Sequence, residues 1–391
     1  MRPFLLCSAF FLSVSPLWAA PCQDGPALLS KGDVARIVDE YLAARSQAES
    51  NPWDALNMYG DLRLRQEGSF AAAGNPDRYR SRARLRLGGT WASNDTLEVG
   101  ARMVTGSRND PRSPHVTFGD GFQGLELSLD RAYATWRPSL GRDSWLTGGK
   151  FSHPLRRNPV YGELVWDGDI QPEGLALGTS IPLPGALDDL RLSAGQFLLL
   201  EQRLAKDAWC TFAQAATGAS LGNGRAVHVS ASTTFLHDPT PDGANELVDQ
   251  NRGNTLVGGE FAEDFGVFDL VADLAFDGGA RPWVISAEGI RNLRADQSRD
   301  GWALGASLGR AAKRGDWRFY YQLQSIERDA VFSIFAQDDF TRATGFRSHV
   351  LGVNYQLTDG VGLHIWALVS DPHAPTNEDE WRVRIDLNIK F

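Results

Sequence analysis

The 391-residue chain contains little cysteine and, beyond its first twenty residues, no long apolar run. None of its three cysteines stands in a Cys-x-x-Cys or Cys/His spacing, so we expect neither a metal centre nor another cofactor. No later segment reaches the roughly 18 consecutive apolar residues of a membrane-spanning helix. The chain also lacks a basic tail and has a net charge of -9, which argues against a nucleic-acid partner.

Glycine and aromatic residues are abundant instead, with 40 Gly, 12 Trp and 20 Phe. Membrane β-barrels are rich in both, the aromatic residues forming girdles at the two membrane interfaces. Cysteine pairing stays open at this stage. Cys7 lies in a segment that we expect to be removed, and the spacing of Cys22 and Cys210 does not decide whether they form a disulfide.

The amino-terminal residues 1–20 have the features of a secretory signal peptide. Arg2 is followed by the apolar segment Phe4–Val14, and Ala19 and Ala20 provide a cleavage site. We expect residues 21–57 to form a periplasmic segment with a helix at 27–48, where apolar residues recur at three- and four-residue steps. This helix could lie at the mouth of a barrel, plug it or join a coiled coil, and the sequence leaves these alternatives open.

The last eleven residues, Trp381–Phe391, alternate strictly between apolar and polar side chains. The polar positions are Arg382, Arg384, Asp386, Asn388 and Lys390. Because successive side chains of a strand point to opposite faces, one face of this strand is wholly apolar. Such a strand suits lipid on one side and water on the other. Its carboxy-terminal Phe resembles the end of bacterial outer-membrane barrels, which a barrel-assembly machinery recognises.

Seventeen stretches between Tyr59 and the carboxy terminus alternate in this way, and short turns such as Asn223-Gly224 alternate with long loops. A barrel with both ends in the periplasm needs an even number of strands. Thr255–Glu263 is the weakest stretch because Gly258 and Gly259 interrupt it, so we assign it to an external loop. The sequence therefore predicts an all-β fold, a transmembrane antiparallel β-barrel of about 16 strands over residues 58–391, with a short N-terminal periplasmic helix.

Arginine is concentrated on the predicted inward faces of the first three strands and the last one. These pore-lining candidates are Arg63, Arg65, Arg80, Arg82, Arg84, Arg86, Arg102, Arg382 and Arg384. Charged side chains at mid-depth in lipid are costly, so they must face water. They form either a positive wall that favours anions or an ordinary polar lumen in which arginine pairs with Asp and Glu; we favour the former.

The long loop Gly106–Leu125 contains glycines that allow sharp folding. Asp110, Asp120 and Glu126 are therefore candidates for a constriction, in which the loop would bend into the lumen and place carboxylates opposite the arginines. A surface loop outside the membrane is the alternative. The acidic segment Trp166–Asp169, with Glu173, is a further candidate for the lining, for a loosely held Ca²⁺, or for a turn that binds nothing.

The chain resembles a bacterial outer-membrane family known as the "putative porin" family. The resemblance rests on Tyr59–Arg65, on Trp166-Asp167-Gly168-Asp169 with Pro172–Leu175, on Gly315-Asp316-Trp317 and on Asp338-Asp339-Phe340. It covers about Tyr59 to Phe391 and is weakest over Gly185–Ala280. The resemblance implies a sixteen-stranded barrel that passes small solutes and has no catalytic residues.

From these features we expect an outer-membrane porin of a Gram-negative bacterium that allows passive diffusion of small hydrophilic solutes and prefers anions. The alternatives are a channel specific for small anions and a structural barrel that anchors the N-terminal periplasmic helix. We expect no enzymatic activity, because the seven histidines are scattered and none has a nucleophile nearby on its own strand. The expected partners are outer-membrane lipid, small solutes and the assembly machinery, and a homotrimer is left open.

Overall fold

The computed structural model of the protein describes residues 30–48, 55–71, 76–107, 109–139, 143–203, 206–240, 246–277, 279, 281–373 and 379–391. The chain divides into two compact units, Met1–Asp54 and Ala55–Phe391. Residues 1–20 lie outside the described residues, so the expected signal peptide stays a prediction. Cys22, whose pairing the sequence leaves open, lies outside them as well. Cys210 is a buried free thiol.

The first unit contains helix α1, Lys31–Ala48, within the range 27–48 expected from the sequence. The apolar positions Val34, Ile37, Val38 and Tyr41 are all exposed. Among the described residues, no helix combines the length and the apolar character needed to cross a membrane.

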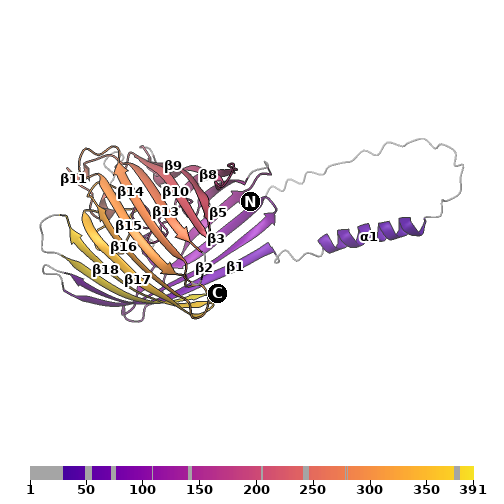
Figure 1. Ribbon diagram of the computed structural model, residues 1–391, viewed down its shortest axis with the longest axis horizontal. Coiled ribbons are helices and arrows are strands. Elements are labelled where there is room, and N and C mark those ends of the chain that lie inside the picture. Colours follow the sequence, from indigo (N-terminus) through magenta and orange to yellow (C-terminus); the bar gives the residue numbers. More distant parts are fainter. Residues whose placement is uncertain are drawn as a thin grey trace, which may run out of the picture. The chain divides into compact units, whose positions relative to one another are not determined.

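The second unit is a closed antiparallel barrel of sixteen strands over its described residues (Figure 1). The strands are β1 (Leu56–Ala71), β2 (Arg78–Asn94), β3 (Leu97–Thr105), β5 (Leu127–Trp136), β6 (Ser144–Lys150), β7 (Glu173–Ile181), β8 (Leu190–Leu200), β9 (Ala208–Gly222), β10 (Arg225–His237), β13 (Gly266–Phe276), β14 (Trp283–Asn292), β15 (Asp300–Gly309), β16 (Trp317–Ile326), β17 (Phe346–Thr358), β18 (Val361–Pro372) and β19 (Glu380–Lys390). Each strand pairs with its neighbour along the chain, and β19 pairs with β1 to close the barrel.

The predicted barrel and its number of strands are confirmed. Thr255–Glu263 does not span the barrel; it forms the small hairpin of β11 (Leu256–Val257) and β12 (Glu260–Phe261) in the loop between β10 and β13. A two-residue β4 (Val116–Thr117) pairs with β2, and a short 3-10 helix lies at Val248–Gln250.

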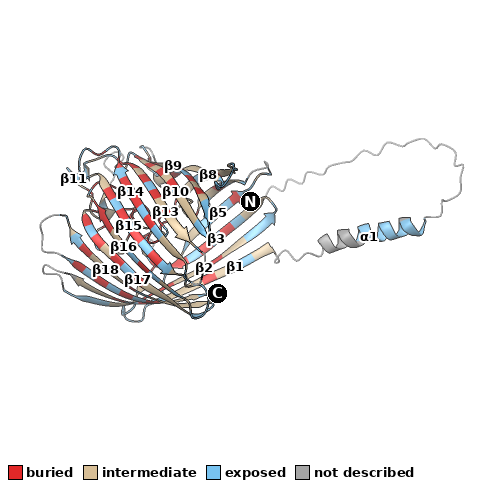
Figure 2. Cartoon of the chain, in the orientation of Figure 1, coloured by how far each residue is buried: buried red, intermediate tan, exposed pale blue. Residues whose placement is uncertain are grey.

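Exposure alternates along the strands, as Figure 2 shows for much of the barrel wall. On β19, Arg382, Arg384 and Asp386 are buried, whereas Val383 and Ile385 between them are exposed. The apolar face therefore points outward and the charged face into the lumen. Because the number of strands is even, the start of β1 and the end of β19 lie at the same end of the barrel. We call it the short-turn end, after turns such as Asn223-Gly224, and the opposite end the long-loop end.

Backbone hydrogen bonds between β1 and the last residue complete the closure. The Gly60 N–H donates to the Phe391 carbonyl at 2.7 Å, and the Phe391 N–H donates to the Gly60 carbonyl at 3.1 Å. The Phe391 ring lies over Gly60, where any Cβ would overlap it. Gly60 thus leaves the space in which the terminal aromatic ring covers the barrel seam.

Loops from the long-loop end fill part of the barrel. Val160, Tyr161 and Leu164 of the loop 151–172 pack against inward residues of β13–β18 in one apolar cluster. Trp166 and Ile170 join a second cluster with inward aromatic residues of β8 and β9 and with the loop 327–345. Fully burying each large apolar side chain stabilises the fold by about 1.5–3 kcal/mol. The core of this barrel therefore lies inside its lumen, on the β7–β17 side.

Gly60→Val should prevent closure of the β1–β19 seam, because the new side chain overlaps the Phe391 ring. We expect the compact, faster-migrating band of unheated protein on detergent gels to be strongly reduced. Gly289→Val is the matched control, since Gly289 is also a strand glycine but has no other group within 4 Å of an added Cβ. Equal yields of compact barrel for both variants would contradict this role of Gly60.

Candidate functional site: a charged slit in the lumen

The predicted arginines lie on the inward faces of β1, β2, β3 and β19. Six are buried, namely Arg65, Arg82, Arg84, Arg102, Arg382 and Arg384, while Arg63, Arg80 and Arg86 are half-buried. The register places Arg63 directly opposite Arg84, and Arg65 opposite Arg82. Like charges at directly paired positions repel each other. Such a wall needs anionic partners.

Carboxylates on the same wall provide many of these partners. Asp61 accepts hydrogen bonds from Arg84 at 2.9 Å and from Arg86 at 2.7 Å. Asp386 forms a bidentate pair with Arg65, at 2.7 and 2.9 Å. The remaining wall pairs are Arg384 with Glu67 at 2.6 Å, Arg102 with Asp130 at 2.5 Å, Arg382 with Glu380 at 2.8 Å, and Arg80 with Glu67. The arginines therefore belong to a paired network rather than to a bare positive surface.

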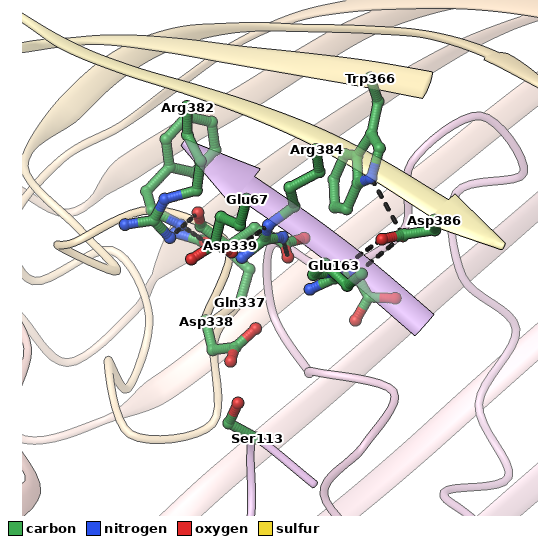
Figure 3. A network of polar contacts seen from close by, with 12 residues as sticks. Glu67, Ser113, Glu163, Gln337, Asp338, Asp339, Trp366, Arg382, Arg384 and Asp386 are labelled. Carbon is green, nitrogen blue, oxygen red and sulfur yellow. Dashed lines mark hydrogen bonds and ion pairs between the residues drawn. The ribbon is translucent and has the colours of Figure 1, made fainter. Parts of the chain in front are cut away.

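Trp366 on β18 holds two of these cations in place. The guanidinium of Arg384 lies 4.7 Å from the ring centre and that of Arg65 lies 5.5 Å from it. The indole N–H donates to Asp386 at 3.2 Å. Cation–π contact with Trp366 thus holds both guanidiniums against the wall, and Asp386 joins the indole to Arg65. Figure 3 shows Trp366 with Arg384 and Asp386.

Two loops carry further carboxylates across the lumen to this wall. Asp339, in the loop 327–345, binds Arg384 and accepts a hydrogen bond from the Tyr161 hydroxyl. Asp169, in the loop 151–172, lies 3.4 Å from Arg86 and 3.6 Å from Arg84. Figure 3 shows Asp339 beside Arg384 and Glu67, with Asp338 on the same loop.

The two loops are joined to each other by backbone hydrogen bonds. The Asp167 N–H donates to the Phe335 carbonyl at 2.6 Å, and the Gln337 N–H donates to the Glu163 carbonyl at 2.9 Å. The Asp338 N–H donates to the Asp167 carboxylate at 3.1 Å. Each loop also packs into an apolar cluster, so the carboxylates that face the wall are held in place. We call these loop carboxylates the platform: Glu163, Asp167, Asp169, Asp338 and Asp339.

Between wall and platform lies a cavity of about 500 Å³. Six arginines line it, namely Arg63, Arg65, Arg84, Arg86, Arg157 and Arg318. Six acidic residues line it as well, namely Glu163, Asp167, Asp169, Asp338, Asp339 and Asp386. We call this cavity the charged slit. A second cavity of about 470 Å³, lined by residues including Asp110, Asp130 and Lys150, shares Asp169 with it.

Burial and neighbouring charges shift the protonation of the platform. Burial raises the pKa of Glu163 to about 8, and the nearby Asp339 and Asp169 add to the effect although Arg157 opposes it. Burial and Glu163 likewise raise the pKa of Asp167 well above its usual range. Burial alone would raise the pKa of Asp339, but Arg384 and the Tyr161 hydroxyl outweigh burial and lower it.

The predicted constriction loop, Gly106–Leu125, reaches the arginine wall, but not through its predicted carboxylates. Ser113 and the His115 carbonyl accept hydrogen bonds from Arg82, and His115 lines the slit. Asp120 and Glu126 are exposed, and Asp110 pairs within its own loop with Arg112 at 3.3 Å. The loop 106–126 instead follows β2, where Thr117 is paired with Arg82. The structure does not bring these three carboxylates to the arginine wall.

The acidic segment before β7 gives a mixed result. Asp167 and Asp169 line the slit, whereas Glu173 is exposed and pairs with Lys150 at 2.6 Å. Sequence reasoning missed Glu163, Asp338 and Asp339 as slit residues. The pair Asp338-Asp339 next to an apolar Phe340 in a long loop is a signal that could have indicated them. Among the described residues, no three His, Cys, Asp or Glu side chains are grouped as metal ligands.

A sixteen-stranded barrel whose outer face is apolar and whose lumen holds a charged slit defines a porin-type outer-membrane channel. The chain belongs to the "Putative porin" family, which it matches over residues 72–202 and 257–391. The expected resemblance is thereby confirmed. A comparison with curated protein sequences found no significant match.

Solved structures support the fold. OprB of Pseudomonas putida is similar with a TM-score of 0.58 and 10% identity, over 90% of this chain and 97% of that one. OmpF of Salmonella typhi, solved in complex with daunomycin, has a TM-score of 0.50 and 11% identity, over 86% and 97% of the two chains. Identities this low establish the barrel architecture alone.

Gly305→Leu should displace the loop 151–172 from the lumen. Gly305 is a buried residue of β15, and a Cβ there would lie 3.0 Å from the Cβ of Val160 and from the side-chain oxygen of Gln322. A leucine leaves no room for the loop, so single-channel conductance in planar bilayers should rise. Gly289→Leu, on the open face of β14, is the control. If the Gly305→Leu barrel folds and its conductance is unchanged, the loop 151–172 does not narrow the conducting path.

Proposed function

We propose that the protein allows passive diffusion of small hydrophilic solutes across the outer membrane, with the charged slit as its selectivity filter. This proposal rests on one observation: carboxylates of two loops contact the arginine wall inside the lumen, Asp169 at Arg86 and Asp339 at Arg384. The loops narrow the path and align opposite charges on its two sides, which favours small polar solutes over large or apolar ones.

Protonation supports an anion preference. The slit has equal numbers of arginines and acidic residues, but the pKa of Glu163, raised to about 8 by burial, keeps this carboxyl group neutral at pH 7. Burial and Glu163 also raise the pKa of Asp167. The remaining charges leave an excess of positive charge. The preference is modest because wall carboxylates pair with most arginines, as they would in a polar lumen without selectivity. A channel specific for small anions is the closest alternative.

The topology supports an orientation as well. With residues 1–20 as a signal peptide and 21–57 in the periplasm, the short-turn end faces the periplasm and the long loops face outward. The terminal strand β19, which ends with Phe391 at the seam, is suited to recognition by the barrel-assembly machinery. A homotrimer fits this class of barrel.

The arginines of the slit should set its ion selectivity. Arg63→Gln and Arg86→Gln should each lower the anion-to-cation permeability ratio by about tenfold. One unit charge acting over roughly 6 Å of water changes the partition of each ion by about threefold, in opposite directions for anions and cations. The measurement is the reversal potential of the purified protein in a planar bilayer under a salt gradient. The exposed Arg291, paired with Asp300, gives the control Arg291→Gln. An unchanged potential in both slit variants would remove the arginines as the filter.

Anion preference should also fall as pH rises from 6 to 9. A raised carboxyl pKa means that Glu163 is neutral below about pH 8 and negative above it, so the positive excess shrinks at high pH. Glu163→Gln should flatten this part of the pH dependence of the reversal potential. A wild-type preference that grows between pH 6 and 9 would refute the assignment.

A further inference from the structure

His115 has an unusual position at the edge of the charged slit. It precedes β4, whose Val116 and Thr117 pair with Ala83 and Arg82 of β2. Its carbonyl accepts a hydrogen bond from Arg82 at 3.3 Å. The backbone is thus attached to the arginine wall, and the imidazole, which is 9% exposed, lines the slit.

The charged groups with the largest effect on this imidazole are cations. They are Arg63 and Arg65 of β1 and Arg82 and Arg84 of β2. Burial and these four guanidiniums lower the pKa of His115 well below its usual range, so the ring is neutral. A neutral imidazole has one donor and one acceptor nitrogen, whereas arginine only donates. These four guanidiniums therefore offer no acceptor to the donor nitrogen of the ring.

Two buried nitrogen atoms of the slit have no hydrogen-bond partner within the described structure, the Nε2 of His115 and the Nε of Arg84. Arg84 is 4% exposed, and its terminal nitrogen donates to Asp61 while its Nε does not. Buried polar groups normally have partners. Two such groups in one cavity, together with the half-buried Arg63, match the needs of a ligand that carries negative acceptor oxygens.

We propose that His115, Arg63 and Arg84 form a binding subsite for a small oxyanion, a carboxylate or inorganic phosphate, within the slit. The subsite rests on the proposed function, because the ligand reaches it through the conducting path. The oxygens of the oxyanion accept hydrogen bonds from the imidazole and the guanidiniums. Its negative charge offsets the repulsion between Arg63 and Arg84, which lie opposite each other. Asp169, at 3.6 Å from Arg84, is the loop carboxylate nearest to that guanidinium and limits how long the ligand stays.

The test is block of chloride current through single channels in planar bilayers, with phosphate or acetate added at constant ionic strength. In the wild type, one of these anions should reduce the current in a saturable manner. His115→Leu should weaken the block at least tenfold, and His115→Gln, which keeps a donor, should restore part of it. His237→Leu is the control, because His237 is exposed and contacts Thr211 on the outer face.

The outcomes separate the subsite from the channel. A wild type that forms no channel would overturn the proposed function, whereas chloride conductance without block by phosphate or acetate would overturn the subsite alone. Block that is equal in His115→Leu and wild type would remove His115 from it. If His115→Leu does not fold, His115→Gln is the deciding variant. Because Gln keeps an N–H donor, a folded His115→Gln channel that shows no block would refute the donor role of His115. Block by only one anion identifies the ligand class.

Discussion

The buried guanidinium of Arg384 is the contact on which the lumen of this barrel depends. Arg384 is 1% exposed and lies on the closing strand β19. It binds Glu67 of β1, Asp339 of the loop 327–345 and the face of Trp366 on β18. It therefore joins the barrel seam to an inserted loop. Removing one partner of such a buried ion pair typically costs about 3–5 kcal/mol, because the other charge stays buried without compensation.

A second constraint divides the lumen into two halves. Apolar clusters formed by the loops 151–172 and 327–345 fill the side of β7–β17. Charges concentrate on β19, β1, β2 and β3, and the slit lies along β1, β2 and β19 of this wall. Burial of an unpaired charge is costly, so the charged wall and the carboxylate platform require each other. In the described part of the slit, some buried polar groups are neither covered by apolar packing nor paired with another charged group.

The strands could be predicted because alternation is a local property. Trp381–Phe391 shows it without reference to any other segment, and the same pattern excluded Thr255–Glu263. The inward direction of Arg63, Arg84 and Arg384 followed from the same alternation. Their partners did not follow, because Asp339 and Asp169 reach the wall from loops far away in the sequence. Glycines in the loop 106–126 suggested that its carboxylates form a constriction. The loop does reach the wall, but with Ser113 and His115, because glycine permits sharp folding without deciding which side chains face the lumen.

Sequence alone thus determined a barrel, its sixteen strands and the concentration of arginine on one wall, since a two-residue period and an even strand number need only the order of residues. Tertiary structure decided which loops enter the lumen and which carboxylates face the arginines. The reason is that loop insertion depends on complementary surfaces, such as Val160 against the bare backbone of Gly305. Such complementarity exists only once the strands that carry those surfaces have closed into a barrel.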